Sequence, residues 1–193
     1  LARNNSGYKN LIKLVSCGYR GDQLKDVPVT LEQDLDDHSL DLVGLSSSLK
    51  GEFAYLVSLL KRDCGKGELI FDEQHPKVGR VCQALREHAK EMESRFGKGN
   101  YYVELIHNQL AEQQVLLPDL VYVAQCLGLP IVASADAHYL DRDFSETHAL
   151  AIAIKNSLTM NDIKERRRNA QFHLTSDEEI RALFSRWPEA IEN

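Results

Sequence analysis

Long apolar runs are missing from this sequence of 193 residues. None approaches the roughly 20 residues that a transmembrane helix needs, and the first residues lack the basic-then-apolar layout of a secretory signal peptide. The motifs G-x-x-x-x-G-K-[ST], G-x-G-x-x-G and G-x-S-x-G are also absent. We therefore expect a cytoplasmic protein with no membrane partner, without nucleotide-cradling loops or serine-hydrolase chemistry.

Cysteine is scarce and widely spaced. The four cysteines, Cys17, Cys64, Cys82 and Cys126, include no C-x-x-C pair. This spacing argues against a structural zinc knuckle and against a dense disulfide framework. We expect four unpaired thiols, buried or without a chemical role.

Basic residues are outnumbered, since 23 Lys and Arg stand against 29 Asp and Glu, giving a net charge of -6. Tight binding to nucleic acid through bulk charge is therefore not expected. The run Lys164 to Arg168 (KERRR) could contact phosphates locally. Because Glu165 interrupts it and acidic residues surround it, a solvated face is the expected role.

The residues that are present suit one soluble domain. Hydrophobic residues make up 43% of the chain and charged residues 27%, which is enough apolar material to bury a core. The length fits one domain or a large piece of one. Because the chain opens on Leu1 rather than Met and a helix follows at once, we expect residues 1–193 to be a fragment of a longer protein.

Helical periodicity marks several segments. The clearest lies between Pro76 and Phe96, where apolar residues recur at steps of three and four. Ser176, with Glu179 three residues later, matches a capping box that opens a last helix. Further helices are predicted over residues 6–17, 51–61, 112–127 (with Pro118 as a kink or restart) and 145–154. Residues 22–39 predict a long connection with at most a short helix.

Three apolar segments have the length of strands: residues 40–45 (LDLVGL), 101–106 (YYVELI) and 131–135 (IVASA). The first ends in the serines 46–48, which resemble a turn. Since helical segments separate these strands, we expect a parallel α/β arrangement, open or closed. Three strands are too few to close a barrel.

The sharpest local signal is Asp136-Ala137-His138, at the end of the third strand. Side chains two apart on a strand point to the same side, so the carboxylate and the imidazole would converge at the C-terminal edge of the sheet. Sites of parallel α/β folds gather at that edge, and this donor pair suits Zn²⁺ or Mn²⁺. For the pattern alone, the commoner interpretation is that Asp136 caps a turn and His138 is a half-exposed loop residue.

Other polar residues near the strand ends have two interpretations each. Glu104 either points into a polar site or, as alternation favours, faces solvent. His107 and Asn108 follow the second strand and would lie near Asp136 if the second and third strands are neighbours. His148 lies on the next helix, where a lone histidine is usually structural or exposed.

Four stretches carry a family resemblance: LARNNSGYKNLIKLVSCGY, GLSSSLKGEF, GLPIVASADAHYL and QFHLTSDEEIRALFSRWPEAIEN. In order and spacing they resemble landmarks of the PHP (polymerase and histidinol phosphatase) domain at the N-terminus of bacterial DNA polymerase III alpha subunits. The resemblance covers nearly the whole chain. Its first and last stretches look like polymerase alpha subunits rather than free-standing PHP phosphatases.

The resemblance implies a partial, distorted (β/α)7 barrel whose first strands are missing and whose last part runs to the junction with the polymerase body. The family's metal site lies at the C-terminal mouth, and its opening H-x-H strand, T-D-H element and a further Glu have no counterpart in this chain. Asp136 and His138, completed by Tyr139, match the D-x-H-Y metal-binding motif. Ser48 falls where many relatives have a Cys or another ligand, and a hydroxyl is a poorer zinc donor than a thiolate. An incomplete Zn²⁺ or Mn²⁺ site is therefore expected.

The resemblance also implies a role in DNA replication as part of a DNA-directed DNA polymerase. Family members with a full ligand set resemble metal-dependent 3′ to 5′ proofreading exonucleases, whereas members with eroded ligands look like scaffolds. Expected partners are the rest of the alpha subunit, the proofreading exonuclease subunit, other replisome subunits, and DNA through the intact polymerase. The isolated chain, with no catalytic residue assigned, is expected to be inactive. The alternative is a free-standing PHP phosphoesterase of the histidinol-phosphatase type.

Overall fold

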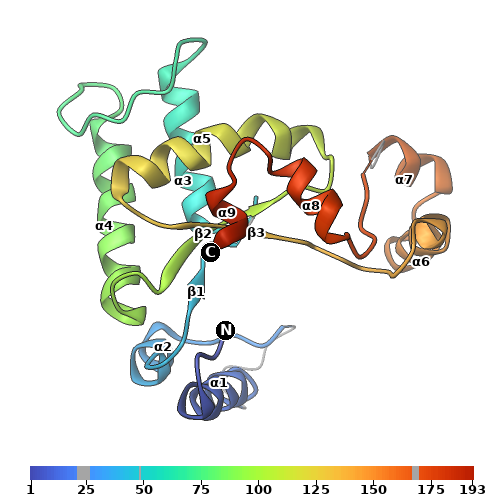
Figure 1. The fold of residues 1–193 in the computed structure, drawn as a ribbon, viewed down its shortest axis with the longest axis horizontal. Coiled ribbons are helices and arrows are strands. Elements are labelled where there is room, and N and C mark those ends of the chain that lie inside the picture. The colour runs from blue at the N-terminus through green and yellow to red at the C-terminus, as the bar shows by residue number, and fades with distance from the viewer. Residues whose placement is uncertain (21–26, 48, 167–169) are drawn as a thin grey trace.

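A computed structural model describes residues 1–20, 27–47, 49–166 and 170–193. The strands are β1 (Gly44–Leu45), β2 (Tyr101–Ile106) and β3 (Ile131–Ser134). The helices are α1 (Asn5–Gly18), α2 (Glu32–His38), α3 (Glu52–Cys64), α4 (Gly79–Phe96), α5 (Ala111–Leu127), α6 (Ser145–Asn156), α7 (Met160–Arg166), α8 (Asp177–Leu183) and α9 (Glu189–Glu192), with a 3-10 turn η1 at Arg142–Phe144. Parallel strands alternate with helices (Figure 1), so the predicted α/β class is confirmed and agrees with a partial PHP-type barrel.

The three strands form one parallel sheet in the order β1-β2-β3. The first strand is much shorter than predicted, since only Gly44 and Leu45 pair with β2, and Asp41 adopts a left-handed backbone with φ 61°. Residues 41–43 instead pair with the first residues of the chain: the Val43 amide donates to the Leu1 carbonyl at 2.7 Å. The prediction of a strand over residues 40–45 is therefore wrong for its first four residues.

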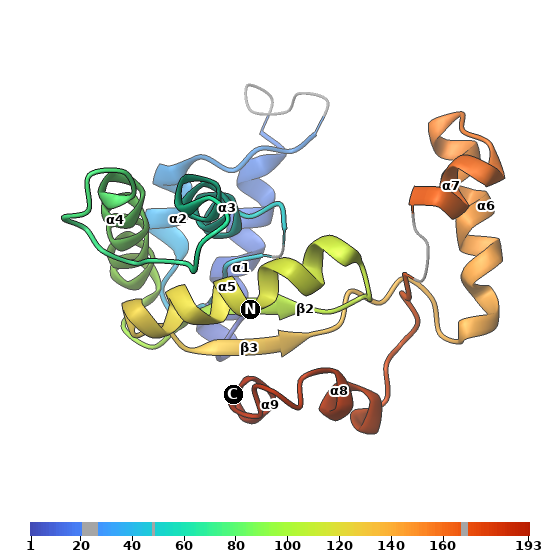
Figure 2. The same cartoon turned by 90° about the horizontal axis from the view of Figure 1, so that it is seen from above.

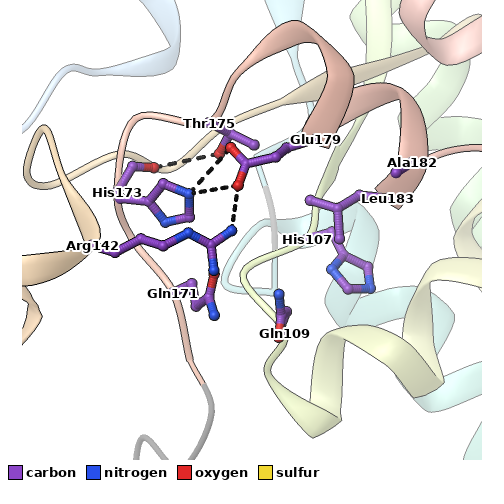
Figure 3. A pocket seen from close by; sticks show the side chains of 9 residues that line it. All are labelled: His107, Gln109, Arg142, Gln171, His173, Thr175, Glu179, Ala182 and Leu183. Atoms are coloured by element: carbon purple, nitrogen blue, oxygen red, sulfur yellow. Dashed lines mark hydrogen bonds and ion pairs between the residues drawn. The ribbon is translucent and has the colours of Figure 1, made fainter.

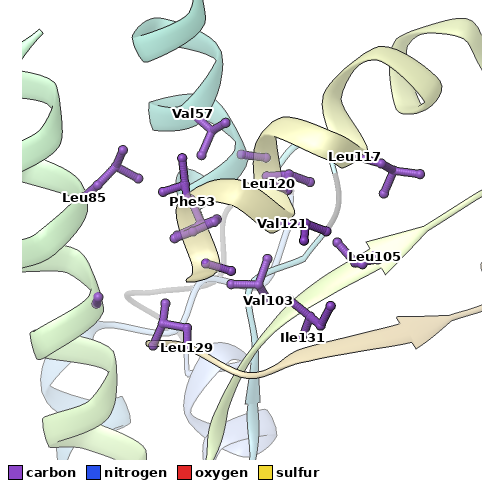
Figure 4. Close-up of a cluster of buried hydrophobic side chains, with 14 of the residues drawn as sticks. Phe53, Val57, Leu85, Val103, Leu105, Leu117, Leu120, Val121, Leu129 and Ile131 are labelled. Atoms are coloured by element: carbon purple, nitrogen blue, oxygen red, sulfur yellow. The ribbon is translucent and has the colours of Figure 1, made fainter. Parts of the chain in front are cut away.

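Alternation along β2 places the core on one face of the sheet. Tyr101, Val103 and Leu105 are buried, and helices α3, α4 and α5 cover them. Figure 4 shows Phe53 and Val57 of α3 in one cluster with Val103 of β2 and with the inner face of α5. Burial of this cluster is the main force holding the helices to the sheet.

The local helix predictions agree well with the structure. The inner face of α4 includes Leu85 and Ala89, as its periodicity predicts. Pro118 lies inside a helix that continues on both sides of it. The capping box of α8 is present, with the Ser176 hydroxyl accepting from the Glu179 amide and the Glu179 carboxylate accepting from the Ser176 amide.

The outer edge of β3 is covered by the C-terminal helix. The Pro130 carbonyl accepts a hydrogen bond from the Val103 amide of β2. The next carbonyl, that of Ile131, points away from β2 and accepts a hydrogen bond from Asn193 Nδ2 at 3.0 Å. Helix α9 lies along this edge, while α6 and α7 pack on each other at a distance from the sheet (Figure 2). All four cysteines are free. Within the described ranges, no helix is long and apolar enough to span a bilayer.

Candidate metal centre

Asp136 and His138 meet just beyond the carboxyl end of β3. The Nε2 atom of His138 lies 3.1 Å from Oδ1 of Asp136, and the two side chains are 43% and 46% exposed. The convergence expected from their spacing is therefore observed. Their role as metal ligands stays a prediction.

A second segment holds the His138 backbone in place. The His138 amide donates to the Phe172 carbonyl at 2.7 Å, and the Tyr139 amide donates to the same oxygen at 3.2 Å. The Phe172 amide in turn donates to the Tyr139 hydroxyl at 3.1 Å. The Phe172 ring packs edge-on against the His138 imidazole, with centroids 5.3 Å apart. These contacts limit the orientations that the imidazole can adopt.

Asn108, in the loop between β2 and α5, ties this region to the sheet. Its side chain is buried, and Nδ2 donates to the Gln171 carbonyl at 2.8 Å and to the Asp136 carbonyl at 3.4 Å. The buried Gln113 pairs with it, since Gln113 Nε2 donates to Asn108 Oδ1 at 3.3 Å and Gln113 Oε1 accepts from the Asn108 amide at 2.6 Å. Asn108 thus lies near Asp136, as neighbouring strands require.

Glu104 lies on the sheet face that the helices do not cover. Its Oε1 accepts a hydrogen bond from Ser134 Oγ at 2.6 Å, and its amide donates to Ser46 Oγ at 3.0 Å. The carboxylate is half-buried rather than simply solvated, which corrects the interpretation that alternation favoured. Because Ser134 precedes Asp136 by two residues, this bond also holds the end of β3.

Two histidines have surroundings that sequence reasoning missed. The ring of His148 stacks on the His138 ring with centroids 5.1 Å apart, so the helical histidine is part of this cluster. His107 packs its ring against Phe184 instead, with Nδ1 buried. The available signal was the position of His148 on the helix that follows the D-x-H turn. Ser48 lies outside the described residues, as do the side chains of the basic run at 164–168.

The pair supplies two of the donors that a metal centre needs. A carboxylate oxygen and an imidazole nitrogen 3.1 Å apart suit Zn²⁺ or Mn²⁺ chemically. Catalytic zinc sites use three protein ligands. Across the described ranges, no third His, Cys, Asp or Glu joins Asp136 and His138 in a group that could hold an ion. The described residues therefore do not by themselves make a complete centre.

Parallel strands, intervening helices and polar side chains at a strand end define an α/β protein with a candidate site at the carboxyl edge of the sheet. The PHP domain family model matches residues 1–108, and the chain belongs to this family. Asp136 and His138 lie beyond the matched residues.

The whole chain is also similar to bacterial polymerase subunits. It is 32% identical over 197 residues to DNA polymerase III subunit alpha of Treponema pallidum (strain Nichols) and 30% identical over 195 residues to that of Escherichia coli (strain K12). The subunit of Vibrio cholerae is 27% identical over 194 residues. Each alignment covers 100% of this chain and 15% of the relative, so the chain spans about 15% of the length of these curated relatives.

Proposed function

We propose that residues 1–193 are the later part of the PHP domain of a DNA polymerase III alpha subunit and act in DNA replication within that subunit. The observation that carries this proposal is the alignment of the entire chain with alpha subunits from several bacteria. The rest of the alpha subunit, the proofreading exonuclease subunit, other replisome subunits and DNA are the proposed partners. The free-standing phosphatase has no comparable support.

Within the intact domain, Asp136 and His138 contribute two donors to a metal centre whose other ligands come from outside this chain. Bound Zn²⁺ or Mn²⁺ would supply an activated water and charge stabilisation for 3′ to 5′ phosphodiester cleavage. In this chain, Oδ1 of Asp136 lies 3.1 Å from Nε2 of His138 and orients the imidazole. The rings of Phe172 and His148 pack against the imidazole and restrict its orientation. Without the remaining ligands, residues 1–193 alone should not cleave a phosphodiester.

The first experiment uses the full-length parent subunit. With Mn²⁺ and a 5′-labelled primer strand, the parent should shorten the primer from its 3′ end, and His138→Ala should abolish this while polymerisation continues. His38→Ala, a histidine on α2 away from the site, is the matched control and should leave nuclease activity unchanged. A parent without nuclease activity that still binds a separate exonuclease subunit would instead support the scaffold role.

The second experiment uses residues 1–193 and measures metal content after dialysis against Zn²⁺ or Mn²⁺. We expect weak, substoichiometric retention, because two donors hold an ion poorly. Tight retention of one ion per chain, lost in His138→Ala, would contradict the proposal that the chain carries an incomplete centre.

A further inference from the structure

Helices α6 and α7 form an arm that extends away from the sheet, and a side chain of this arm reaches the candidate metal centre. Helix α6 packs mainly on α7 and on η1 (Figure 2). His148, in the first turn of α6, is half-buried. Its ring stacks on the His138 ring, with centroids 5.1 Å apart and 21° between the planes. The arm therefore contacts the candidate centre through an imidazole.

Two further rings hold His148 in this place. The centroid of the Tyr139 ring lies 5.2 Å from that of His148, and the centroid of the Phe172 ring lies 6.1 Å from it. Phe172 also packs against the His138 ring, at 5.3 Å. Centroid distances between 4.5 and 7 Å are those of attractive aromatic pairs. The two imidazoles therefore belong to one packed cluster of four rings.

Stacking suits a ligand that has to be oriented. An imidazole binds an ion through a ring nitrogen, in the plane of the ring. A neighbour on the face of the ring, such as His148, fixes the direction of that plane and leaves the ring edge to the ion. The His138 side chain is 43% exposed, so much of it stays open to solvent. His148 can therefore restrict His138 without occupying a ligand position.

The base of the arm is attached to the rest of the chain by contacts that do not involve His148. Arg142 of η1 forms an ion pair with Glu179 of α8, and the Glu179 carboxylate lies 3.4 Å from Nε2 of His173 (Figure 3). These three residues line a cavity of about 160 Å³ together with Gln171. Removal of the His148 ring should therefore leave the base of the arm attached.

We propose that His148 is a positioning residue: its stack on His138 couples the arm to the candidate metal centre, so that ion affinity depends on the arm lying in this place. The inference rests on the proposed metal centre and adds a control over it from residues outside the sheet. The stack requires a flat ring at position 148 and no nitrogen. Phenylalanine should therefore replace His148, whereas alanine should not.

The first measurement is the Zn²⁺ affinity of the full-length parent subunit, in competition with a chromogenic chelator. The ion that the wild type binds and that His138→Ala does not bind defines the centre. His148→Ala should weaken its binding about tenfold or more, as is usual for residues that orient metal ligands. His148→Phe should stay within about threefold of the wild type, because it keeps the stack. Ile154→Ala, at an exposed position of the same helix, is the matched control.

The second measurement needs no metal ion. NMR of residues 1–193 follows the carbon-bound protons of the His138 ring, whose resonances are displaced by the ring current of a stacked neighbour. His148→Ala should remove this displacement, and His148→Phe should retain a displacement.

The outcomes separate this inference from the proposed function. A parent that binds no Zn²⁺ through His138 would overturn the proposed centre and this inference with it. A Zn²⁺ affinity that depends on His138 but is unchanged in His148→Ala would overturn the coupling alone. Binding in His148→Phe as weak as in His148→Ala would mean that the imidazole nitrogens act, and would overturn the stacking role. Unchanged His138 resonances in His148→Ala would also overturn it.

Discussion

Asn108 joins three segments that lie far apart in the sequence, and its replacement by alanine should loosen all of them. Its side chain bonds to backbone carbonyls 28 and 63 residues away, those of Asp136 and Gln171, and to the Gln113 side chain five residues away. Asn108 and Gln113 are both buried. Alanine keeps the backbone bonds of residue 108 but removes every side-chain bond.

The expected loss of stability follows from the groups left unpaired. Asn108→Ala leaves the Gln171 carbonyl and the Gln113 Nε2 donor without their hydrogen-bond partner. Each buried group left unpaired lowers the free energy of unfolding by about 1–3 kcal/mol. The longer bond to the Asp136 carbonyl, at 3.4 Å, adds little. The free energy of unfolding should therefore fall by about 2–6 kcal/mol.

Urea denaturation, followed by far-UV circular dichroism, measures this change. Hydrogen exchange provides a local readout, since the His138 amide, bonded to Phe172, should lose protection together with the Gln171 amide. Gln114→Ala changes the exposed neighbour of Gln113 and should alter stability by less than about 0.5 kcal/mol. A loss below about 1 kcal/mol in Asn108→Ala, with unchanged protection at His138, would refute the assignment of Asn108 as the link.

Three further predictions concern pH and packing. Burial lowers the pKa of His88 below its ordinary value of 6.5, so the unfolded state takes up a proton first as the pH falls below 6.5 and stability declines. His88→Gln, which can still bond to the Tyr101 hydroxyl, should flatten this part of the stability curve measured by urea denaturation at successive pH values. The pKa of Glu179 is lowered to about 2, so its stabilising contribution is present above about 4.5 and is lost as the pH falls toward 2; Glu179→Gln should lose it at every pH, and an NMR titration of the carboxyl carbon checks the pKa. Phe53→Ala, at a fully buried core position, should cost about 3–5 kcal/mol and lower the thermal midpoint seen by calorimetry.

For each of these three predictions, one experimental result would contradict the physical reason given. A pH profile of His88→Gln that parallels the wild type would mean that burial of this imidazole does not affect acid stability. A Glu179 carboxyl that titrates near 4.5 would mean that the capping box and Arg142 do not hold it ionised in solution. Loss of less than about 1.5 kcal/mol in Phe53→Ala would imply that the core collapses around the cavity.

Local pattern alone determined much of the helical framework and the position of the candidate pair. The apolar steps of α4, the capping box at Ser176 and the alternation of β2 are set by neighbours within four residues, and all appear in the structure. The spacing of Asp136 and His138 after a strand was likewise enough to predict that their side chains converge. Recognition of the four landmark stretches also predicted the family that residues 1–108 match.

Tertiary structure alone decided the surroundings of that pair. The short β1, the stacking of His148 on His138, the buried link through Asn108 and the cavity beside Gln171 depend on segments that meet from distant parts of the chain. No periodicity or cap encodes such contacts, because the residues involved lie well apart in the sequence, up to 63 positions for the bond between Asn108 and Gln171. Local preferences choose the helices and strands, but the burial of polar groups between them is settled only when the whole chain packs.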